Sequence, residues 1–198
     1  HHRGRDHAGL KAAARAVTQI KWASDLSQEA LLQLDVLHSQ AGRLNLDPDC
    51  NSWNELLAEA LLRLAPRLKP VKLIINDMDV RIWGDSQHLT AVLENLLQNA
   101  IDAIFEVKKE NFTPTLWIEI GREFEWSFIR ITDNGPGIDS KHLRKIFRPF
   151  YTTKPTKNNW GMGLAYCHRV IKAHRGFINI RSIVGEGATA EIVLRNIN

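Results

Sequence analysis

Apolar residues recur at helical spacing near the start of the chain. Over residues 8–22 they fall three and four positions apart, and the same spacing returns from Leu31 to Leu44 after a short polar break. Two amphipathic helices joined by so short a turn pack antiparallel, and pairing two such hairpins would cover both apolar stripes. The pattern therefore predicts a helical hairpin over 1–46 that forms a homodimer through residues 8–45.

After a polar boundary at 45–51, the pattern changes between helical periodicity and strand alternation. A helix is predicted from Ser52, with Glu55 as its capping-box partner, to about Ala65. The remaining elements are predicted as strands at 71–76, 79–84, 115–123, 126–133, 177–183 and 188–195, and as helices at 85–109 and 162–174. Strands with interleaved helices favour an α+β domain over 52–198, a two-layer α/β sandwich in which helices cover one face of a mixed sheet.

Composition narrows the class of protein. The 198 residues are 44% hydrophobic and 24% charged, which is typical of a soluble globular protein, and no run approaches the roughly 18 apolar residues of a membrane span. Cys50 and Cys167 show no metal-binding spacing, which favours a reducing, cytoplasmic setting without membrane contact by this fragment. A longer parent protein could still carry a membrane segment upstream of residue 1. The opening His-His could come from a tag.

Positive charge is concentrated in one part of the sequence. The net charge is +4, but residues 139–158 carry six Lys or Arg residues against a single acid, Asp139. Such a segment favours an anionic partner, and the alternative is an exposed loop whose charges serve solubility.

The predicted helix over 85–109 carries an unusual polar stripe. Asn95, Asn99 and Asp102 fall at positions i, i+4 and i+7, on the side opposite the apolar residues. Asn and Asp are poor helix formers because they compete for backbone hydrogen bonds. Amide oxygens can bind Mg²⁺, a hard cation that prefers oxygen ligands, so the stripe suggests a metal site; the alternative is an ordinary solvent-facing side.

The stretch ITDNGPGI, residues 131–138, ends a predicted strand. On its own it fits a turn, since Asn-Gly and Pro-Gly are turn signals. Asp133 stands at the strand end, where a fixed carboxylate can accept the amino group of adenine. Gly135 and Gly137 would let the backbone approach the ring closely.

Two further stretches can contact phosphate. In KIFRPFYTTK, Phe147 and Phe150 can anchor a loop, while hydroxyls and an ammonium follow at Thr152, Thr153 and Lys154. Gly161 and Gly163 precede the helix at 162–174, and a glycine-rich turn at a helix N-terminus binds anions. The P-loop pattern GxxxxGK[ST] is absent, and GMGLAY lacks the third glycine of GxGxxG.

Taken in order, NLLQNAIDAI, DNGPGI, IFRPFYTTK and GMGLAYCHRVIKAHRG resemble the N, G1, F and G2 boxes of bacterial sensor histidine kinases. That family belongs to the ATPase superfamily of type II topoisomerases, heat-shock chaperones and mismatch-repair proteins, and the resemblance covers about residues 52–195. It implies a Bergerat-type ATP-binding fold with a mobile lid over about 139–163. It also implies that ATP and Mg²⁺ are the cofactors.

The resemblance assigns roles to particular residues. It implies Mg²⁺ binding by Asn99 with support from Asn95, adenine recognition by Asp133, and a catalytic part for Asn95, Asn99 and Lys154. Asp102 stands where many of these kinases have a lysine. The implied ATP contacts are Asn99, Asp102, Asp133, Gly135, Gly137, Ile138, Phe147, Thr152, Thr153, Lys154, Gly161, Met162, Gly163 and Leu164.

The predicted hairpin resembles the dimerisation and phosphotransfer element of the same kinases, but its histidines depart from the pattern. The family's phosphoacceptor His is followed by an acidic residue, an aliphatic residue and then Arg or Lys. His1, His2 and His7 lack these followers, and His38 falls on the second helix. The acceptor either lies upstream of residue 1 or is absent.

The function implied is a bacterial histidine kinase of a two-component system. It would transfer the γ-phosphoryl group of Mg·ATP to a His on the hairpin and then to an Asp of a response regulator. One alternative is a non-catalytic dimeric nucleotide-binding module without an acceptor. A mechanical ATPase of the superfamily is a weaker alternative, because those chains continue into a transducer domain. The order of the boxes argues against a nucleic-acid partner.

Overall fold

The computed structural model describes residues 44–153 and 161–197, which fall in the compact unit Leu44–Asn198. The predicted hairpin and its dimer contacts lie outside the described residues, apart from 44–46. The elements are β1 (Asp49–Ser52), α3 (Trp53–Arg63), α4 (Ala65–Leu68), β2 (Lys72–Asn76), β3 (Arg81–Gly84), α5 (Ser86–Phe105), β4 (Thr115–Glu123), β5 (Trp126–Asp133), α6 (Ser140–Leu143), α7 (Gly163–Ala173), β6 (Phe177–Ile183) and β7 (Gly187–Arg195). Within the described part of the chain, no helix has the length and apolar character needed to cross a membrane.

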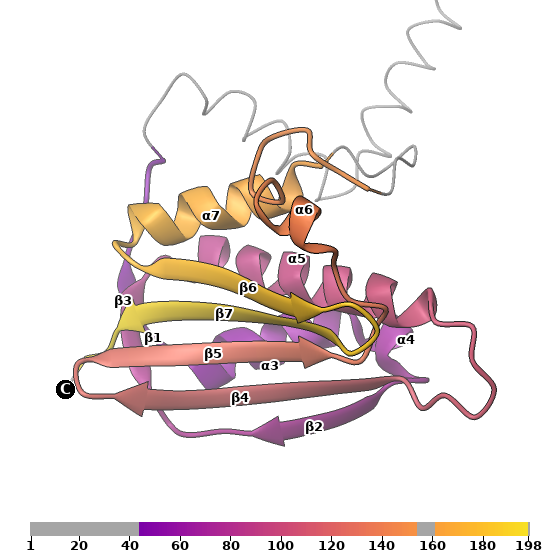
Figure 1. The fold of residues 1–198 in the computed structure, drawn as a ribbon. Coiled ribbons are helices and arrows are strands. Elements are labelled where there is room, and N and C mark those ends of the chain that lie inside the picture. Colours follow the sequence, from indigo (N-terminus) through magenta and orange to yellow (C-terminus); the bar gives the residue numbers. More distant parts are fainter. Residues whose placement is uncertain (1–43, 154–160, 198) are drawn as a thin grey trace, which may run out of the picture. The chain divides into compact units, whose positions relative to one another are not determined.

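The main sheet has five strands in the order β2-β4-β5-β7-β6 (Figure 1). β2 runs parallel to β4, and the other neighbours are antiparallel. The sheet is therefore mixed, as predicted. Its central strand β5 alternates strictly between buried and half-buried residues, which is typical of a sheet covered on one face.

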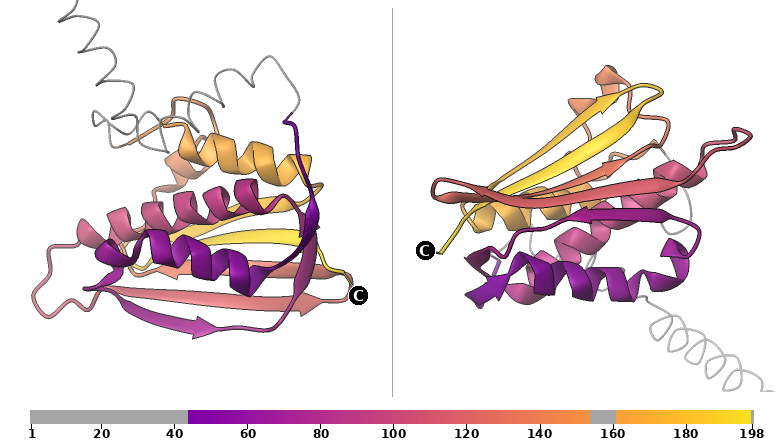
Figure 2. Two further views of the ribbon diagram at one scale, coloured as in Figure 1. Left: turned by 180° about the vertical axis from the view of Figure 1, so that it is seen from behind. Right: turned by 90° about the horizontal axis from the view of Figure 1, so that it is seen from below.

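Helices α3, α5 and α7 lie on the same face of this sheet (Figures 1 and 2). α5 is the central helix of that layer and buries a broad apolar side made of Leu89, Val92, Leu93, Leu96, Leu97, Ala100, Ile101 and Ile104. α3 is joined to the sheet by a buried hydrogen bond, since Trp53 Nε1 donates to Ser127 Oγ at 2.9 Å. The prediction of a two-layer α/β sandwich is confirmed.

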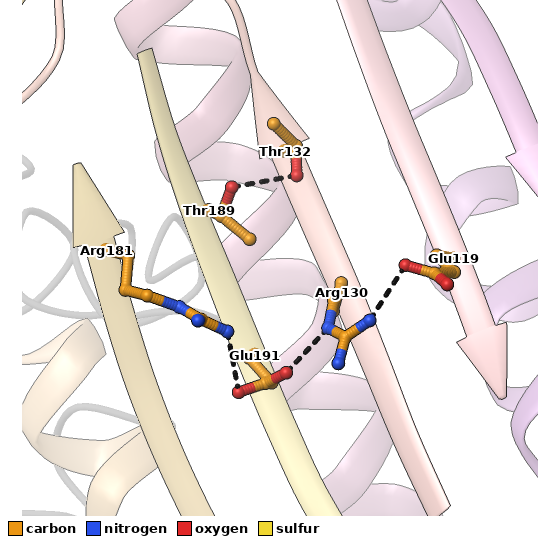
Figure 3. Close-up of polar contacts among 6 residues, drawn as sticks. All are labelled: Glu119, Arg130, Thr132, Arg181, Thr189 and Glu191. Atoms are coloured by element: carbon orange, nitrogen blue, oxygen red, sulfur yellow. Dashed lines mark hydrogen bonds and ion pairs between the residues drawn. The ribbon is translucent and has the colours of Figure 1, made fainter. Parts of the chain in front are cut away.

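The opposite face of the sheet carries a chain of cross-strand ion pairs (Figure 3). Arg130 on β5 lies between Glu119 of β4, at 3.0 Å, and Glu191 of β7, at 2.6 Å. Arg181 of β6 extends the chain with a contact of 3.2 Å to Glu191. The Arg130 guanidinium also lies 3.9 Å from the ring centroid of Phe128. These charges suit a sheet face that contacts water.

Some predicted elements differ from the structure. The stretch at 79–84 is a strand only from Arg81, and it pairs with β1 in a separate two-stranded sheet. β1 was not predicted, and most of it lies in the stretch predicted as a boundary at 45–51. Three of its four residues are not buried, so they show no alternation that would indicate a strand. The helix predicted over 85–109 ends at Phe105, with Glu106 as its C-cap.

The start of α3 is capped differently from the prediction. Ser52 is the N-cap, but its hydroxyl accepts a hydrogen bond from the N–H of Asn54 at 3.2 Å rather than from that of Glu55. The capping box is therefore wrong, while the position of the helix start is right. The short helices α4 and α6 were not predicted, because four residues are too few to show periodicity.

Candidate functional site

The polar stripe of α5 begins beside the helix α7. Asn95 is half-buried, and its Nδ2 donates to the carbonyl of Ala91 at 2.8 Å. Its Oδ1 faces Gly163, where a Cβ atom would lie only 2.5 Å from that oxygen. Asn99, one turn further along, is exposed. The first two members of the predicted stripe therefore run from the glycine turn along the open side of α5.

The third member of the stripe is engaged elsewhere. Asp102 Oδ1 accepts from Arg67 Nη2 of α4 at 2.7 Å and from Gln98 Nε2 at 3.1 Å. The structure therefore directs this carboxylate toward α4. No local pattern predicts the contact with Arg67, because it joins residues 35 positions apart.

The second part of the site is the loop after β5. Asp133 is only 5% exposed, and its Oδ1 accepts from the N–H of Gly135 at 2.8 Å. Gly135 packs directly on α5, since a Cβ there would lie 2.9 Å from that of Ala103. Ala103 is one turn beyond Asn99, so the Asp133 loop contacts the same side of α5 as the asparagines.

Two further glycines fix this loop against the β6–β7 turn. A Cβ at Gly137, whose φ is +74°, would lie 2.2 Å from the carbonyl oxygen of Ile183. A Cβ at Gly187, whose φ is +107°, would lie 1.9 Å from the carbonyl oxygen of Asp133. The N–H of Ile138 donates to Ser182 Oγ at 2.8 Å. The carboxylate of Asp133 is thus held by tightly packed backbone, and Ile138 lies half-buried at the end of the loop.

The third part is the start of α7. Gly161 has a φ of +68°, and Met162, which is 2% exposed, precedes the first helical residue without making a side-chain cap. Gly163 and Leu164 are half-buried in the first turn. An uncapped helix N-terminus presents backbone N–H groups and the positive end of the dipole, which suits an anion.

The predicted lid is described only at its two ends. The ring centroid of Phe147 lies 5.4 Å from that of His168, so this phenylalanine contacts helix α7. Phe150 is 57% exposed with a φ of +63°, so its anchoring role was wrong. A Cβ at Gly161 would lie 2.6 Å from the carbonyl of Tyr151, so the two ends are in contact. Thr152 is half-buried and Thr153 exposed, whereas Lys154 lies outside the described residues.

Within the described residues, no group of three or more His, Cys, Asp or Glu side chains could hold a metal ion. Burial raises the pKa of the Cys167 thiol far above its usual range, so that thiol does not supply a ligand either. Asn95 brings an amide oxygen to Gly163 at the start of α7, and Asn99 carries another amide one turn further along α5. A single amide ligand fits Mg²⁺, which keeps several waters and takes the rest of its ligands from phosphates.

Sequence reasoning missed a polar junction at the other end of α7. Asp85 caps α5, and its backbone N–H donates to Nε2 of His174 at 2.9 Å. Asp85 had a detectable signal, since it stands directly before a long helical pattern. His174 had none, because its partner is 89 positions away.

Comparison with known proteins agrees with this arrangement. Residues 84–197 match the family described as histidine kinase-, DNA gyrase B-, and HSP90-like ATPase. The signal transduction histidine-protein kinase AtoS of Escherichia coli is 39% identical over 57% of this chain and 17% of its own length. The C4-dicarboxylate transport sensor protein DctB of Pseudomonas aeruginosa is 28% identical over 96% of this chain and 31% of its own length.

A solved structure shows the same fold. The catalytic domain of the histidine kinase ThkA aligns with a TM-score of 0.65 at 25% identity, covering 75% of this chain and 95% of that domain. The chain spans less than a third of the length of the two curated relatives above, so it corresponds to one part of such proteins.

Proposed function

This chain belongs to the histidine kinase-, DNA gyrase B-, and HSP90-like ATPase family, and we propose that it is the catalytic part of a sensor histidine kinase. Membership of this ATPase family implies that the domain binds ATP. The observation that best supports a nucleotide site is a convergence on α5: the Asp133 loop packs on Ala103, and the glycine turn packs on Asn95.

In the proposal, each part of the site contacts one part of the nucleotide. The buried carboxylate of Asp133 accepts the exocyclic amino group of adenine. The N–H groups that follow Gly161 bind the phosphates, and Lys154 contributes positive charge to them. Asn99 would hold Mg²⁺ with support from Asn95, and a bound cation would supply neutralisation of the phosphate charge. Asp102 is bound to Arg67, so we assign it a structural contact with α4 rather than a phosphate contact.

The reaction we propose is phosphoryl transfer to histidine. A neutral imidazole nitrogen of the acceptor His attacks the γ-phosphorus, the bond from phosphorus to the bridging oxygen breaks, and ADP leaves with that electron pair. Residues of this chain position the γ-phosphate and stabilise its charge. A second transfer then moves the phosphoryl group to an Asp carboxylate of a response regulator, in the cytoplasm.

The acceptor and the dimer belong to residues outside the described part of the chain. We propose a homodimer through residues 8–45, because its apolar stripes exceed what one hairpin can bury. One observation favours a second function, a nucleotide-binding module without catalysis. None of the four histidines at positions 1, 2, 7 and 38 has the followers of a phosphoacceptor.

Transfer in trans distinguishes the two functions. The 198-residue chain is incubated with γ-labelled ATP, Mg²⁺ and a separate hairpin that carries an acidic-aliphatic-basic sequence after its histidine, taken from the parent protein or a close relative. We expect label on the hairpin that is stable to base and labile to acid, and no label when its histidine is replaced by Gln. Tight Mg·ATP binding without any transfer would favour the non-catalytic module.

A further inference from the structure

A polar junction joins three segments at the end of α7 that is remote from the glycine turn. Asp85, which is 7% exposed, uses both carboxylate oxygens: Oδ1 accepts from the N–H of His88 at 2.9 Å and Oδ2 from the N–H of Asp47 at 2.8 Å. Its own backbone N–H donates to Nε2 of His174 at 2.9 Å. Asp47 belongs to the segment 44–48, through which the chain enters the compact unit. The junction therefore connects that segment, the start of α5 and the end of α7.

The hydrogen bonds of His174 define its protonation state. Nδ1 lies 2.8 Å from the carbonyl oxygen of Val170, which can only accept, so Nδ1 carries the proton. Nε2 receives the N–H of Asp85 and must therefore be unprotonated. Only the neutral ring satisfies both contacts. A protonated ring would bring the N–H on Nε2 against the N–H of Asp85, and the hydrogen bond would be lost.

The ring cannot easily turn away from this contact. A Cβ at Gly84 would lie 3.0 Å from Cδ2 of His174 and 2.6 Å from Cδ1 of Leu89, so the imidazole packs on a glycine of β3 that leaves just enough room. Burial lowers the pKa of His174, and it outweighs the opposing effects of the Val170 carbonyl and the Asp85 carboxylate. The neighbouring groups that act on its charge are Asp85 and His88, both at the start of α5.

The Asp85 carboxylate stays ionised between pH 5.5 and pH 8, the range in which histidine titrates. Its burial alone would raise the pKa, but the backbone N–H groups of His88 and Asp47 outweigh this effect and lower it. His88 is itself held by a contact of 2.8 Å between its Nδ1 and the hydroxyl of Tyr166. Protonation of His174 at Nε2 breaks its contact with the backbone N–H of Asp85.

We propose that His174 is a proton-sensitive latch that fastens the segment 44–48 and the start of α5 to the end of α7. The latch is complete when pH lies above about 6.5, the ordinary pKa of histidine in an unfolded chain, and it weakens as pH falls below that value. The equilibrium constant for opening rises by up to about tenfold per pH unit, because one proton binds the open form and not the closed form.

The latch bears on the proposed function because α5 and α7 also carry the nucleotide site. α7 is 11 residues long, so the latch acts roughly 16 Å from Gly163 along a rigid helix. An open latch releases the end of α7 from Asp85, the residue that caps α5 and accepts the hydrogen bond from Asp47. Acidification is thus proposed to regulate how the segment 44–48 and the start of α5 are held at the end of α7.

Amide hydrogen exchange without nucleotide tests the latch. Protection factors of the Asp47 and Asp85 amides are measured between pH 5.5 and pH 8 in the 198-residue chain and in His174→Gln, whose side chain can accept the hydrogen bond but does not titrate. His168→Gln is the matched control on the same helix. We expect protection to fall up to about tenfold per pH unit below pH 6.5 in the wild type and the control, and to stay constant in His174→Gln.

The same pH dependence in His174→Gln as in the wild type would overturn the proposal. Should that variant fail to fold, an NMR titration of the wild-type His174 ring replaces it. A pKa below 6.5, with the Asp85 amide shifting in the same transition, would support the latch, and a pKa above 6.5 or an unmoved Asp85 amide would overturn it. Since no nucleotide is present, failure of the proposed kinase function would leave these readouts unchanged.

Discussion

Replacing Asp133 by Asn should change which nucleotide the domain prefers. Asn keeps one oxygen that can accept from the N–H of Gly135, the 2.8 Å contact that holds the side chain in place. It replaces the other oxygen by an NH₂ group, which would meet the donor amino group of adenine. Because the shape is conserved at a site that is 5% exposed, the fold should be retained.

The size of the effect follows from the charge of the acceptor. A hydrogen bond to a charged group contributes about 1.5–3 kcal/mol net, which corresponds to a loss of about 10- to 140-fold in ATP affinity. Guanine presents a carbonyl oxygen at the equivalent ring position, so GTP should lose less affinity or gain some. The preference for ATP over GTP is therefore expected to fall in Asp133→Asn.

Isothermal titration calorimetry with Mg·ATP and Mg·GTP measures this preference. Asp139→Asn is the matched control, because its side chain caps α6 by accepting from the N–H of Lys141 at 2.9 Å and Asn can do the same. The control should bind as the wild type does. Equal losses for ATP and GTP in Asp133→Asn, or no loss for ATP, would refute adenine recognition by this carboxylate.

Three further predictions use other parts of the domain. Asn99→Ala should weaken nucleotide binding by about tenfold in Mg²⁺, the effect of roughly 1.4 kcal/mol, and much less in EDTA; an equal loss in both would make Asn99 structural. Ser127→Ala leaves the Trp53 indole N–H and a buried carbonyl without their partner, so urea denaturation should show a loss of about 1–3 kcal/mol in the free energy of unfolding, and no loss would contradict the buried contact. Cys50 is exposed whereas Cys167 is fully buried with a raised pKa, so a thiol reagent should label one cysteine in the native chain and two after unfolding.

Local sequence patterns correctly predicted the helices with regular apolar periodicity and the strands with alternating burial. α5 and α7 follow helical periodicity, and β4 and β5 alternate between buried and open positions, so their existence and type were predicted correctly. β1 was missed because pairing with β3, 29 to 35 positions later, makes it a strand, while its own residues show no alternation. The strand order β2-β4-β5-β7-β6 depends on such long-range pairing as well.

Some features of the candidate site also had a local sequence signal, and others depend on contacts between residues far apart in the chain. The glycines had visible signals, and the structure explains them by close contacts, such as that of Gly163 with Asn95. The stripe on α5 predicted that Asp102 would share the direction of the asparagines, but an ion pair with Arg67 draws it toward α4. The junction of Asp85 with His174 joins residues 89 positions apart, so the local periodicity of the sequence does not predict it.

Chemical-shift mapping tests the central claim, that the nucleotide binds along α5 between the Asp133 loop and the start of α7. Mg·ADP is titrated into the ¹⁵N-labelled 198-residue chain, and amide shifts are followed by NMR. The account predicts that the largest shifts fall at Asn95–Ala103, Asp133–Ile138 and Gly161–Leu164, while Arg130 on the opposite face of the sheet stays unmoved. Shifts concentrated on that opposite face, or none at millimolar Mg·ADP, would contradict it.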